Sequence, residues 1–252
     1  MNERFTAKMY MDYVVSQRGI TIGDLNVAPV VILSWSQKII RSMAEATKAE
    51  LSQHWLDIEQ YPLYTENKKA SFAHVPAGAS ATVAMMEELI ACGAKTFVGL
   101  GFAGSLQPTA SIGTCLIPTA CIHEEGTSLH YVDRDTKVAP DDELVKALNE
   151  SCQEKRLKVL SGAIWTTDGP YRELVSKIEN YRKKGVLGVD METSAMYALG
   201  QFRKVRVCNL LVVSDELWHE WKPAFGKPEL QKAVESTECV ILCSIKKILK
   251  LT

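Results

Sequence analysis

The sequence predicts an α/β fold in which helices flank a largely parallel or mixed β-sheet. Apolar segments typical of strands alternate along the chain with segments whose apolar residues recur at helical spacing. Several of the strand-like segments are apolar throughout, which is typical of strands covered by helices on both faces. No linker, repeat or low-complexity tract interrupts the 252 residues, so we expect one domain over residues 1–252.

Seven segments are predicted as strands because they are short and rich in apolar residues. They are residues 27–34, 70–77, 95–101, 114–122, 159–166, 185–191 and 205–215.

Four segments between these strands are predicted as helices. Gly93 ends the first of them, acidic residues suit the dipole at the start of the second, the third follows a strand directly, and Pro228 opens the last. The predicted helices are residues 80–92, 141–155, 192–201 and 228–251.

Composition excludes several classes of protein. The chain is 46% hydrophobic and 23% charged with a net charge of -1, which argues against disorder and gives no reason to expect nucleic acid or an anionic membrane as partner. The seven cysteines contain no Cys-x-x-Cys pair, and the five histidines lack the spacing of metal ligands. We therefore expect no disulfide framework and no metal, and, since no export signal is visible, a cytoplasmic location.

A glycine-rich segment, GLGFAG, follows the third predicted strand. Its glycines, Gly99, Gly101 and Gly104, match the spacing of a dinucleotide-binding turn, but Pro108 and Gly113 interrupt the helix that such a site needs. Two other interpretations stay open: a tight turn at the end of a strand, or a glycine-rich loop against another ligand. A nicotinamide-dependent oxidoreductase is therefore disfavoured.

Two polar segments between predicted elements are interpreted first as structural. Residues 123–131, HEEGTSLHY, are expected to form a surface loop in which His130 is solvated. In residues 165–173, Asp168 is predicted to cap a helix opened by Pro170. Trp165 and Tyr171 could also form a wall for a planar ligand.

Acidic residues also stand where two predicted strands end. The Asp-Met-Glu triplet of residues 190–192 lies where a predicted strand passes into a helix. Asp215 ends an apolar strand before a Trp-rich segment. Ligands of α/β proteins bind at the carboxyl ends of strands, although either acid could serve only the start of a helix. An acid buried beside aromatic residues would have a raised pKa suited to proton donation.

Taken in order, GFAGSLQP, GTSLHY, VDMETSAMYAL and the pair Ser214-Asp215 resemble the nucleoside phosphorylase family, which includes uridine phosphorylase, bacterial purine nucleoside phosphorylase and methylthioadenosine nucleosidase. The resemblance covers roughly residues 27–218. It implies one α/β domain around a distorted, barrel-like mixed sheet flanked by helices. It also implies a homo-oligomer, a dimer or a trimer of dimers, in which a neighbour completes each site.

The activity that this resemblance implies is cleavage of the N-glycosidic bond of a nucleoside by a pentosyltransferase that needs no cofactor beyond phosphate as a co-substrate. Glu192 matches the carboxylate that holds the ribose hydroxyls, Met191 the residue that packs on the sugar, and Asp215 the acid that protonates a purine base. Tyr171 falls near the wall of the base site. Gly101 and Phe102 fall at the family's glycine-rich segment.

The chain departs from the family where the phosphorylases bind phosphate. Gly99 and Ile39 stand where the family has arginines, Trp35 stands near a glycine position, and Phe102 replaces a hydroxyl residue. Phosphate needs charge-assisted donors, for which Lys38, Arg41 and a neighbour's Arg134 are candidates. Leu174 and Ser176 stand where uridine phosphorylases read uracil.

These departures leave the nucleophile open. Phosphorolysis is the first hypothesis because the family's phosphorylases share it, with weak binding of phosphate expected. Hydrolysis by a phosphate-independent nucleosidase and non-catalytic binding of a nucleoside are the alternatives.

Overall fold

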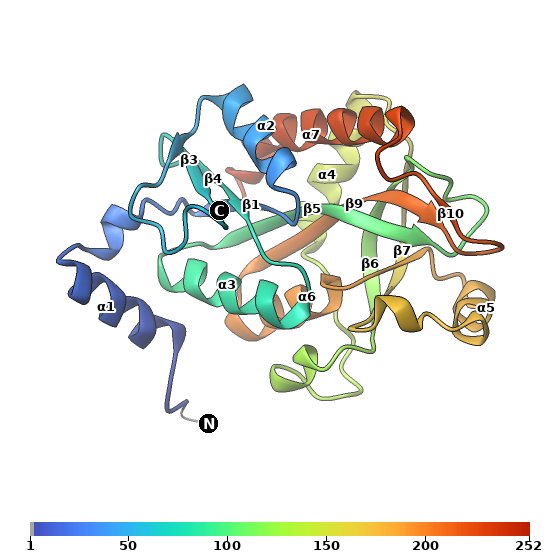
Figure 1. Ribbon diagram of the computed structural model, residues 1–252, viewed down its shortest axis with the longest axis horizontal. Helices are drawn as coiled ribbons and strands as arrows, with labels where there is room; N and C mark the ends of the chain where they lie inside the picture. Colours follow the sequence, from blue (N-terminus) through green and yellow to red (C-terminus); the bar gives the residue numbers. More distant parts are fainter. Residues whose placement is uncertain (1–2) are drawn as a thin grey trace.

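The computed structural model describes residues 3–252, which form an α/β domain (Figure 1). Ten strands build one mixed sheet in the order β10-β9-β6-β7-β8-β5-β1-β4-β3-β2. They are β1 (Val30–Ser34), β2 (Glu50–Leu51), β3 (Leu63–Glu66), β4 (Ala70–His74), β5 (Thr96–Ser105), β6 (Cys115–His123), β7 (Val159–Thr166), β8 (Gly188–Asp190), β9 (Arg206–Glu216) and β10 (Lys222–Pro223).

Seven α-helices within residues 3–252 surround the sheet (Figure 1). They are α1 (Ala7–Arg18), α2 (Gln37–Thr47), α3 (Ala79–Ala91), α4 (Asp142–Glu154), α5 (Val175–Lys183), α6 (Thr193–Arg203) and α7 (Pro228–Ile248). Within residues 3–252, no helix combines the length and the apolar character needed to cross a lipid bilayer.

Part of the sheet closes on itself. Strand β9 pairs with β6 and also with β5, so that β5, β9, β6, β7 and β8 form a closed five-stranded barrel. The β5–β9 pairing is parallel and changes register between Ala103 and Gly104, where Gly104 comes to face Asp215. Such an irregularity bends a strand and redirects its side chains, and here it lies where the acidic side chains described below gather. The barrel predicted from the sequence is confirmed.

Helices cover both faces of the sheet, which explains the uninterrupted apolar runs. On β1, Val30 and Ile32 pack with α2, α4 and α7, whereas Val31 and Leu33 pack with α1, α3 and α6. All five side chains of this strand are buried. A strand with apolar neighbours on both faces has no polar alternation, as predicted.

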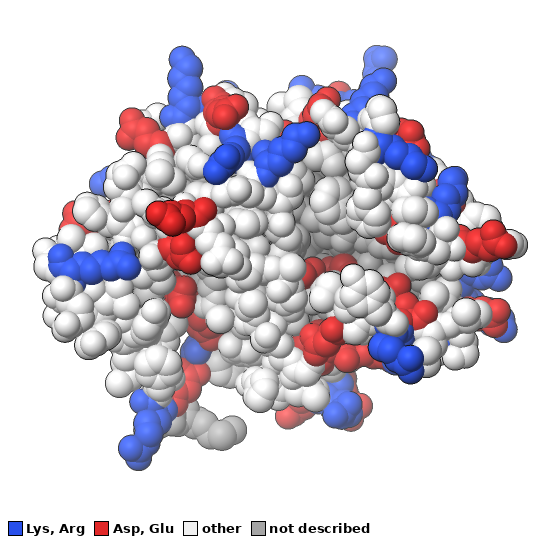
Figure 2. Space-filling model, viewed as in Figure 1, with Lys and Arg blue, Asp and Glu red and all other residues white. Residues whose placement is uncertain are grey.

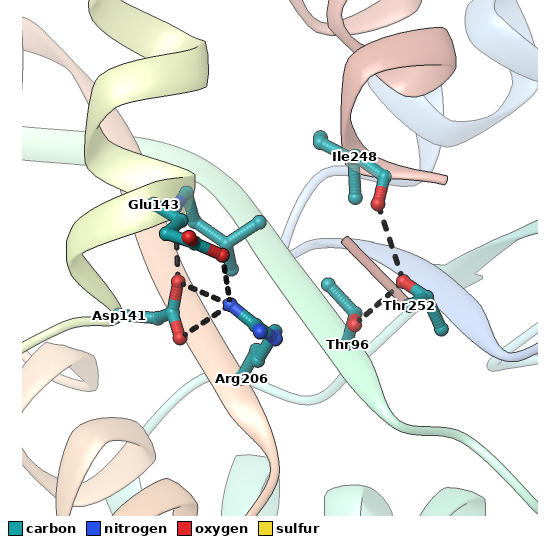
Figure 3. Close-up of polar contacts among 7 residues, drawn as sticks. Thr96, Asp141, Glu143, Arg206, Ile248 and Thr252 are labelled. Carbon is teal, nitrogen blue, oxygen red and sulfur yellow. Dashed lines mark hydrogen bonds and ion pairs between the residues drawn. The ribbon is translucent and has the colours of Figure 1, made fainter. Parts of the chain in front are cut away.

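Polar contacts fix the ends of several elements (Figure 3). Arg206, at the start of β9, donates to both carboxylate oxygens of Asp141 and to Glu143 at the start of α4. The Asp141 carboxylate also accepts from the Leu144 backbone N–H at 3.0 Å and caps the helix. Near the C-terminus, the Thr252 hydroxyl lies 3.0 Å from the Thr96 hydroxyl of β5. These contacts hold α4 and the chain end against the sheet.

All seven predicted strands and all four predicted helices are present, β7 with the predicted bounds and the others with shifted ends. The sequence analysis did not identify three helices, α1, α2 and α5, or the short strands β2, β3 and β10. The interpretation of Asp168 is wrong: a 3-10 helix, Pro170–Arg172, follows it, and Gly169 occupies the cap position without a side-chain bond. Asp168 instead accepts a hydrogen bond from the Gly126 N–H at 2.9 Å.

The prediction that the glycine-rich segment forms a turn or a loop is wrong as well, and its contact with a ligand stays a prediction. Gly99, Gly101 and Gly104 lie inside β5, which continues to Ser105, and no α-helix follows it before α4. The glycines leave space for neighbouring side chains, since a Cβ atom at Gly101 would lie 2.5 Å from the Trp35 ring and one at Gly104 2.6 Å from Leu217. The segment is a strand against which other side chains pack closely, and a dinucleotide turn is excluded.

The cap of α4 gives a prediction for stability. Asp141→Ala removes both the cap and one of the two acidic partners of Arg206, so we expect the free energy of unfolding to fall by about 1–2 kcal/mol. Asp142→Ala is the matched control, because Asp142 is exposed in the first turn. Chemical denaturation of both variants measures the difference, and equal midpoints would contradict the role given to Asp141.

Candidate active site

A cavity of about 750 Å³ opens beside the carboxyl ends of β5, β8 and β9. This is the edge at which α/β sheets bind ligands. Its walls also include Trp35, which follows β1, the 3-10 helix Pro170–Arg172, and the segment that leads through β10 toward α7. The lining residues are Trp35, Phe102, Ala103, Gly104, Pro170, Tyr171, Glu173, Val189, Asp190, Met191, Glu192, Ser214, Asp215, Leu217, Trp221 and Phe225.

Asp190 occupies the junction between β8 and α6. One carboxylate oxygen accepts from the Thr166 hydroxyl of β7 at 2.7 Å, and the other from the backbone N–H and the hydroxyl of Thr193. Burial raises the pKa of Asp190, while the hydrogen bonds from Thr193 and Thr166 act in the opposite direction. The carboxylate joins the barrel to the helix that follows it.

Glu192 occupies the N-cap position of α6 without capping that helix. Its Oε1 accepts from the Gly78 N–H at 2.7 Å, across 114 residues of sequence. Gly78 has a φ of 95°, which a side chain would strain. Burial, and secondly the charge of Asp190, raise the pKa of Glu192. The buried carboxyl has acceptor capacity left to bind hydroxyl groups in the cavity, so its role exceeds that of an acid in a first helical turn.

Asp215 lies near the end of β9 and is buried. Its Oδ1 accepts from the Ser214 hydroxyl at 2.7 Å, and its Oδ2 accepts from the Trp221 indole N–H at 2.9 Å. The carboxylate is therefore held in a fixed orientation among aromatic and apolar groups. It does not cap a helix, because its residue belongs to a strand.

A second acid, Glu173, lines the same end of the cavity. It follows the 3-10 helix Pro170–Arg172 and is half-buried. Burial, and secondly the charge of Asp215, raise the pKa of Glu173 to about 7. Tyr171, on the same turn, is 98% exposed, so its ring lies free at the mouth of the cavity.

The indole of Trp35 covers the middle of β5. Its Nε1 donates to the Thr82 hydroxyl at 2.8 Å, and its ring lies against Gly99 and Gly101. Gly99 also faces Asn209, whose side-chain oxygen would lie 2.3 Å from a Cβ atom there. Nothing larger than glycine fits at these two positions. Gly101 thus lies beneath the indole, and Phe102 lines the cavity next to it.

The cavity wall carries acidic groups without basic ones. Among the residues that the structure describes, its lining includes Glu173, Asp190, Glu192 and Asp215 but neither Lys nor Arg. Figure 2 shows a hollow near the middle of this face with acidic side chains along its lower edge. A multiply charged anion in the cavity would meet these carboxylates without a protein cation to balance its charge.

The structure brings together five of the predicted site residues and separates the rest. Glu192, Met191, Asp215, Tyr171 and Phe102 line one cavity. Gly101 does not line it.

The predicted phosphate ligands lie elsewhere. Lys38 is exposed and borders a second cavity of about 270 Å³ beside α2 and α7, and Arg41 is exposed on α2 outside both linings. The cause lies in α2, which the sequence analysis missed. Helical geometry directs the two side chains outward while Ile39 and Ile40 face the core.

The polar segment at residues 123–131 has a structural role. Its Glu125 is buried and accepts hydrogen bonds from the Ser128 backbone and from the Ser194 hydroxyl of α6 at 2.8 Å. His130 is exposed at the end of a 3-10 helix, as expected. The segment fixes the start of α6 from outside the cavity.

Sequence reasoning missed two acids of the site. Asp190 belongs to the Asp-Met-Glu triplet, but it was not predicted as a site residue. The available signal was the presence of Thr166 and Thr193, whose side chain or backbone binds it. No sequence signal marked Glu173, because its place in the cavity depends on the path of the chain after Pro170.

The comparisons with known proteins place this geometry in context. A model of the Phosphorylase superfamily matches residues 64–242. Uridine phosphorylase of Treponema pallidum is 29% identical over 68% of this chain and 69% of that protein, and purine nucleoside phosphorylase of Plasmodium vivax is 30% identical over 54% and 57%. A purine nucleoside phosphorylase structure from Toxoplasma gondii, solved with immucillin-H, superimposes with a TM-score of 0.82 at 22% identity, covering 91% of this chain and 94% of that one.

The hydroxyl of Thr166 gives a prediction for this site. It donates to Asp190 and accepts from the Ser194 N–H at 3.1 Å, so Thr166→Val leaves buried polar atoms without a partner. We expect a loss of about 1–3 kcal/mol in the free energy of unfolding. Thr109→Val, at an exposed position, is the control, and a loss no larger than the control's in chemical denaturation would contradict this account.

Proposed function

We propose, since the chain belongs to the phosphorylase superfamily, that it cleaves the N-glycosidic bond between the ribose and the base of a nucleoside. The observation that carries this proposal is the pair of buried carboxyl groups in one cavity, Glu192 at a helix start and Asp215 among aromatic side chains. Cleavage of this bond requires that the ribose be held while the departing base is stabilised. The two carboxyl groups stand where they could serve these separate needs.

Glu192 would hold the ribose. Because Oε1 already accepts from the Gly78 N–H, the orientation of the carboxylate is fixed before a ligand binds. Its remaining lone pairs can accept from the two ribose hydroxyls, and hydrogen bonds of this kind contribute about 0.5–1.5 kcal/mol each. Met191, beside it in the lining, would pack on the sugar.

Asp215 would act on the base. Its two hydrogen bonds fix the carboxylate beside Trp221, and Tyr171 is free to stack on a planar ring at the cavity mouth. The pocket would thus bind an aromatic base between apolar groups and present acidic oxygens to its nitrogen atoms.

The group that receives the ribose is either phosphate or water. The relatives named above are phosphorylases, which makes phosphorolysis the first candidate. One observation favours hydrolysis: the Trp35 indole covers Gly99 and Gly101, and none of the described cavity-lining residues is Lys or Arg. We propose that the chain forms a homo-oligomer, as the resemblance implies, and that it acts in the cytoplasm, as the cysteine content suggests.

The role of Glu192 is tested by Glu192→Gln. Glutamine keeps the shape of the side chain but loses the charge, so we expect nucleoside affinity and turnover each to fall at least tenfold while the fold is retained. Calorimetric titration with nucleosides and steady-state kinetics measure both, and circular dichroism checks the fold. Unchanged kinetics would show that Glu192 serves only the start of α6.

Whether phosphate or water receives the ribose is tested by measuring the release of free base from a panel of purine and pyrimidine nucleosides, with and without phosphate. We expect release to depend weakly on phosphate, because phosphate lacks cationic ligands in the cavity. Saturable activation by phosphate would establish phosphorolysis instead. Absence of release from every nucleoside would leave binding without turnover as the function.

A further inference from the structure

Glu173 is a cavity carboxyl group that the proposed function does not use. It lines the cavity together with Asp215, Tyr171 and Trp221, so it belongs to the end assigned above to the base. Burial and the charge of Asp215 are the two causes that raise the pKa of Glu173. Within residues 3–252, no protein group donates a hydrogen bond to its carboxyl group. A half-buried acid that faces a cavity without a protein partner is free to interact with a ligand.

Asp215 is differently placed, although it lies in the same wall. Both of its oxygens accept hydrogen bonds, from Ser214 at 2.7 Å and from Trp221 at 2.9 Å. Protein donors thus already engage both oxygens of Asp215. Asp215 is arranged as a fixed hydrogen-bond acceptor, whereas a departing base needs a proton.

We propose that Glu173 is a catalytic acid, which delivers a proton to the departing base while Asp215, held by Ser214 and Trp221, orients that base. This inference rests on the proposed function. In the step, the electrons of the C1′–N bond move to the base nitrogen, and the O–H bond of Glu173 breaks as its proton bonds to the base. An oxygen of phosphate or of water forms the new bond to C1′, and an attacking water releases one of its protons to solvent. The Glu173 carboxylate regains a proton from solvent after the base leaves.

The surrounding charges favour a protonated Glu173. From β9 it faces Asp215, and from the β8–α6 junction the cavity presents Asp190 and Glu192. Tyr171 is the other titratable side chain of the lining. Burial, and secondly the charge of Asp215, raise the pKa of Glu173 to about 7, which lets it give up a proton near neutral pH.

The pH dependence of kcat in the wild-type protein gives the first test. An acid must be protonated to act, so kcat should fall as pH rises through about 7. Glu173→Gln, which cannot deliver a proton, should lower kcat by about 10²–10⁴-fold, remove this descending limb and leave KM nearly unchanged. Glu173→Asp should restore the limb in part. Glu179→Gln, at an exposed position on α5, is the matched control and should behave like the wild type.

A second variant separates catalysis from a structural effect. In Asp215→Asn, Glu173 loses its negative neighbour, so its pKa falls and the descending limb of the residual activity should move to lower pH. A residue that only supports the fold would lower activity without moving the limb. A limb that persists unchanged in Glu173→Gln would overturn the proposal.

Binding of a C-nucleoside, whose carbon–carbon glycosidic bond resists cleavage, gives a readout that does not require turnover. The affinity of the wild type should fall as pH rises through about 7, because Glu173 loses the proton that it donates to the base, and Glu173→Gln should remove this dependence. If the affinity of the wild type did not vary with pH, the role of Glu173 would be overturned while the proposed function would stand. A wild type that neither cleaves nor binds any nucleoside would overturn the proposed function and this inference with it.

Discussion

The buried carboxylate of Asp190 is the contact on which the rest of the site depends. Its oxygens accept from Thr166 on β7 and from the backbone and hydroxyl of Thr193 at the start of α6, so it joins the closed barrel to one helix. Glu192 is two residues away and reaches Gly78, which precedes α3. A buried charge that is well satisfied thus fixes the position of a second acid whose own charge is disfavoured by burial.

The cavity owes its character to what packs against β5. The change of register in β5 places Gly104 opposite Asp215 of β9. Because Gly99 and Gly101 have no side chains, the Trp35 indole can pack against this strand. The indole turns this face of the strand into an apolar wall, and acids at the ends of β8 and β9 line the same cavity. An environment of this kind suits an uncharged ligand with hydrogen-bond donors better than it suits an anion.

Much of the fold could be predicted from the sequence, because buried strands such as β1 leave a continuous apolar pattern and the larger helices leave a periodic one. The placement of Glu192 and Asp215 in one cavity followed from their positions at strand ends. The glycines of β5 were misread because their reason is a distant side chain, Trp35, and local patterns do not contain such contacts. Lys38 was misplaced for a related reason, since the helix that directs it outward went unrecognised.

The central claim is that one cavity holds ribose at Glu192 and base at Asp215 and Glu173. A crystal structure of the protein with a C-nucleoside tests it most directly. The account predicts that the ribose hydroxyls lie within hydrogen-bond distance of the Glu192 carboxylate and that the base nitrogens face the two other acids. A nucleoside bound in the reverse orientation, or outside this cavity, would contradict the account.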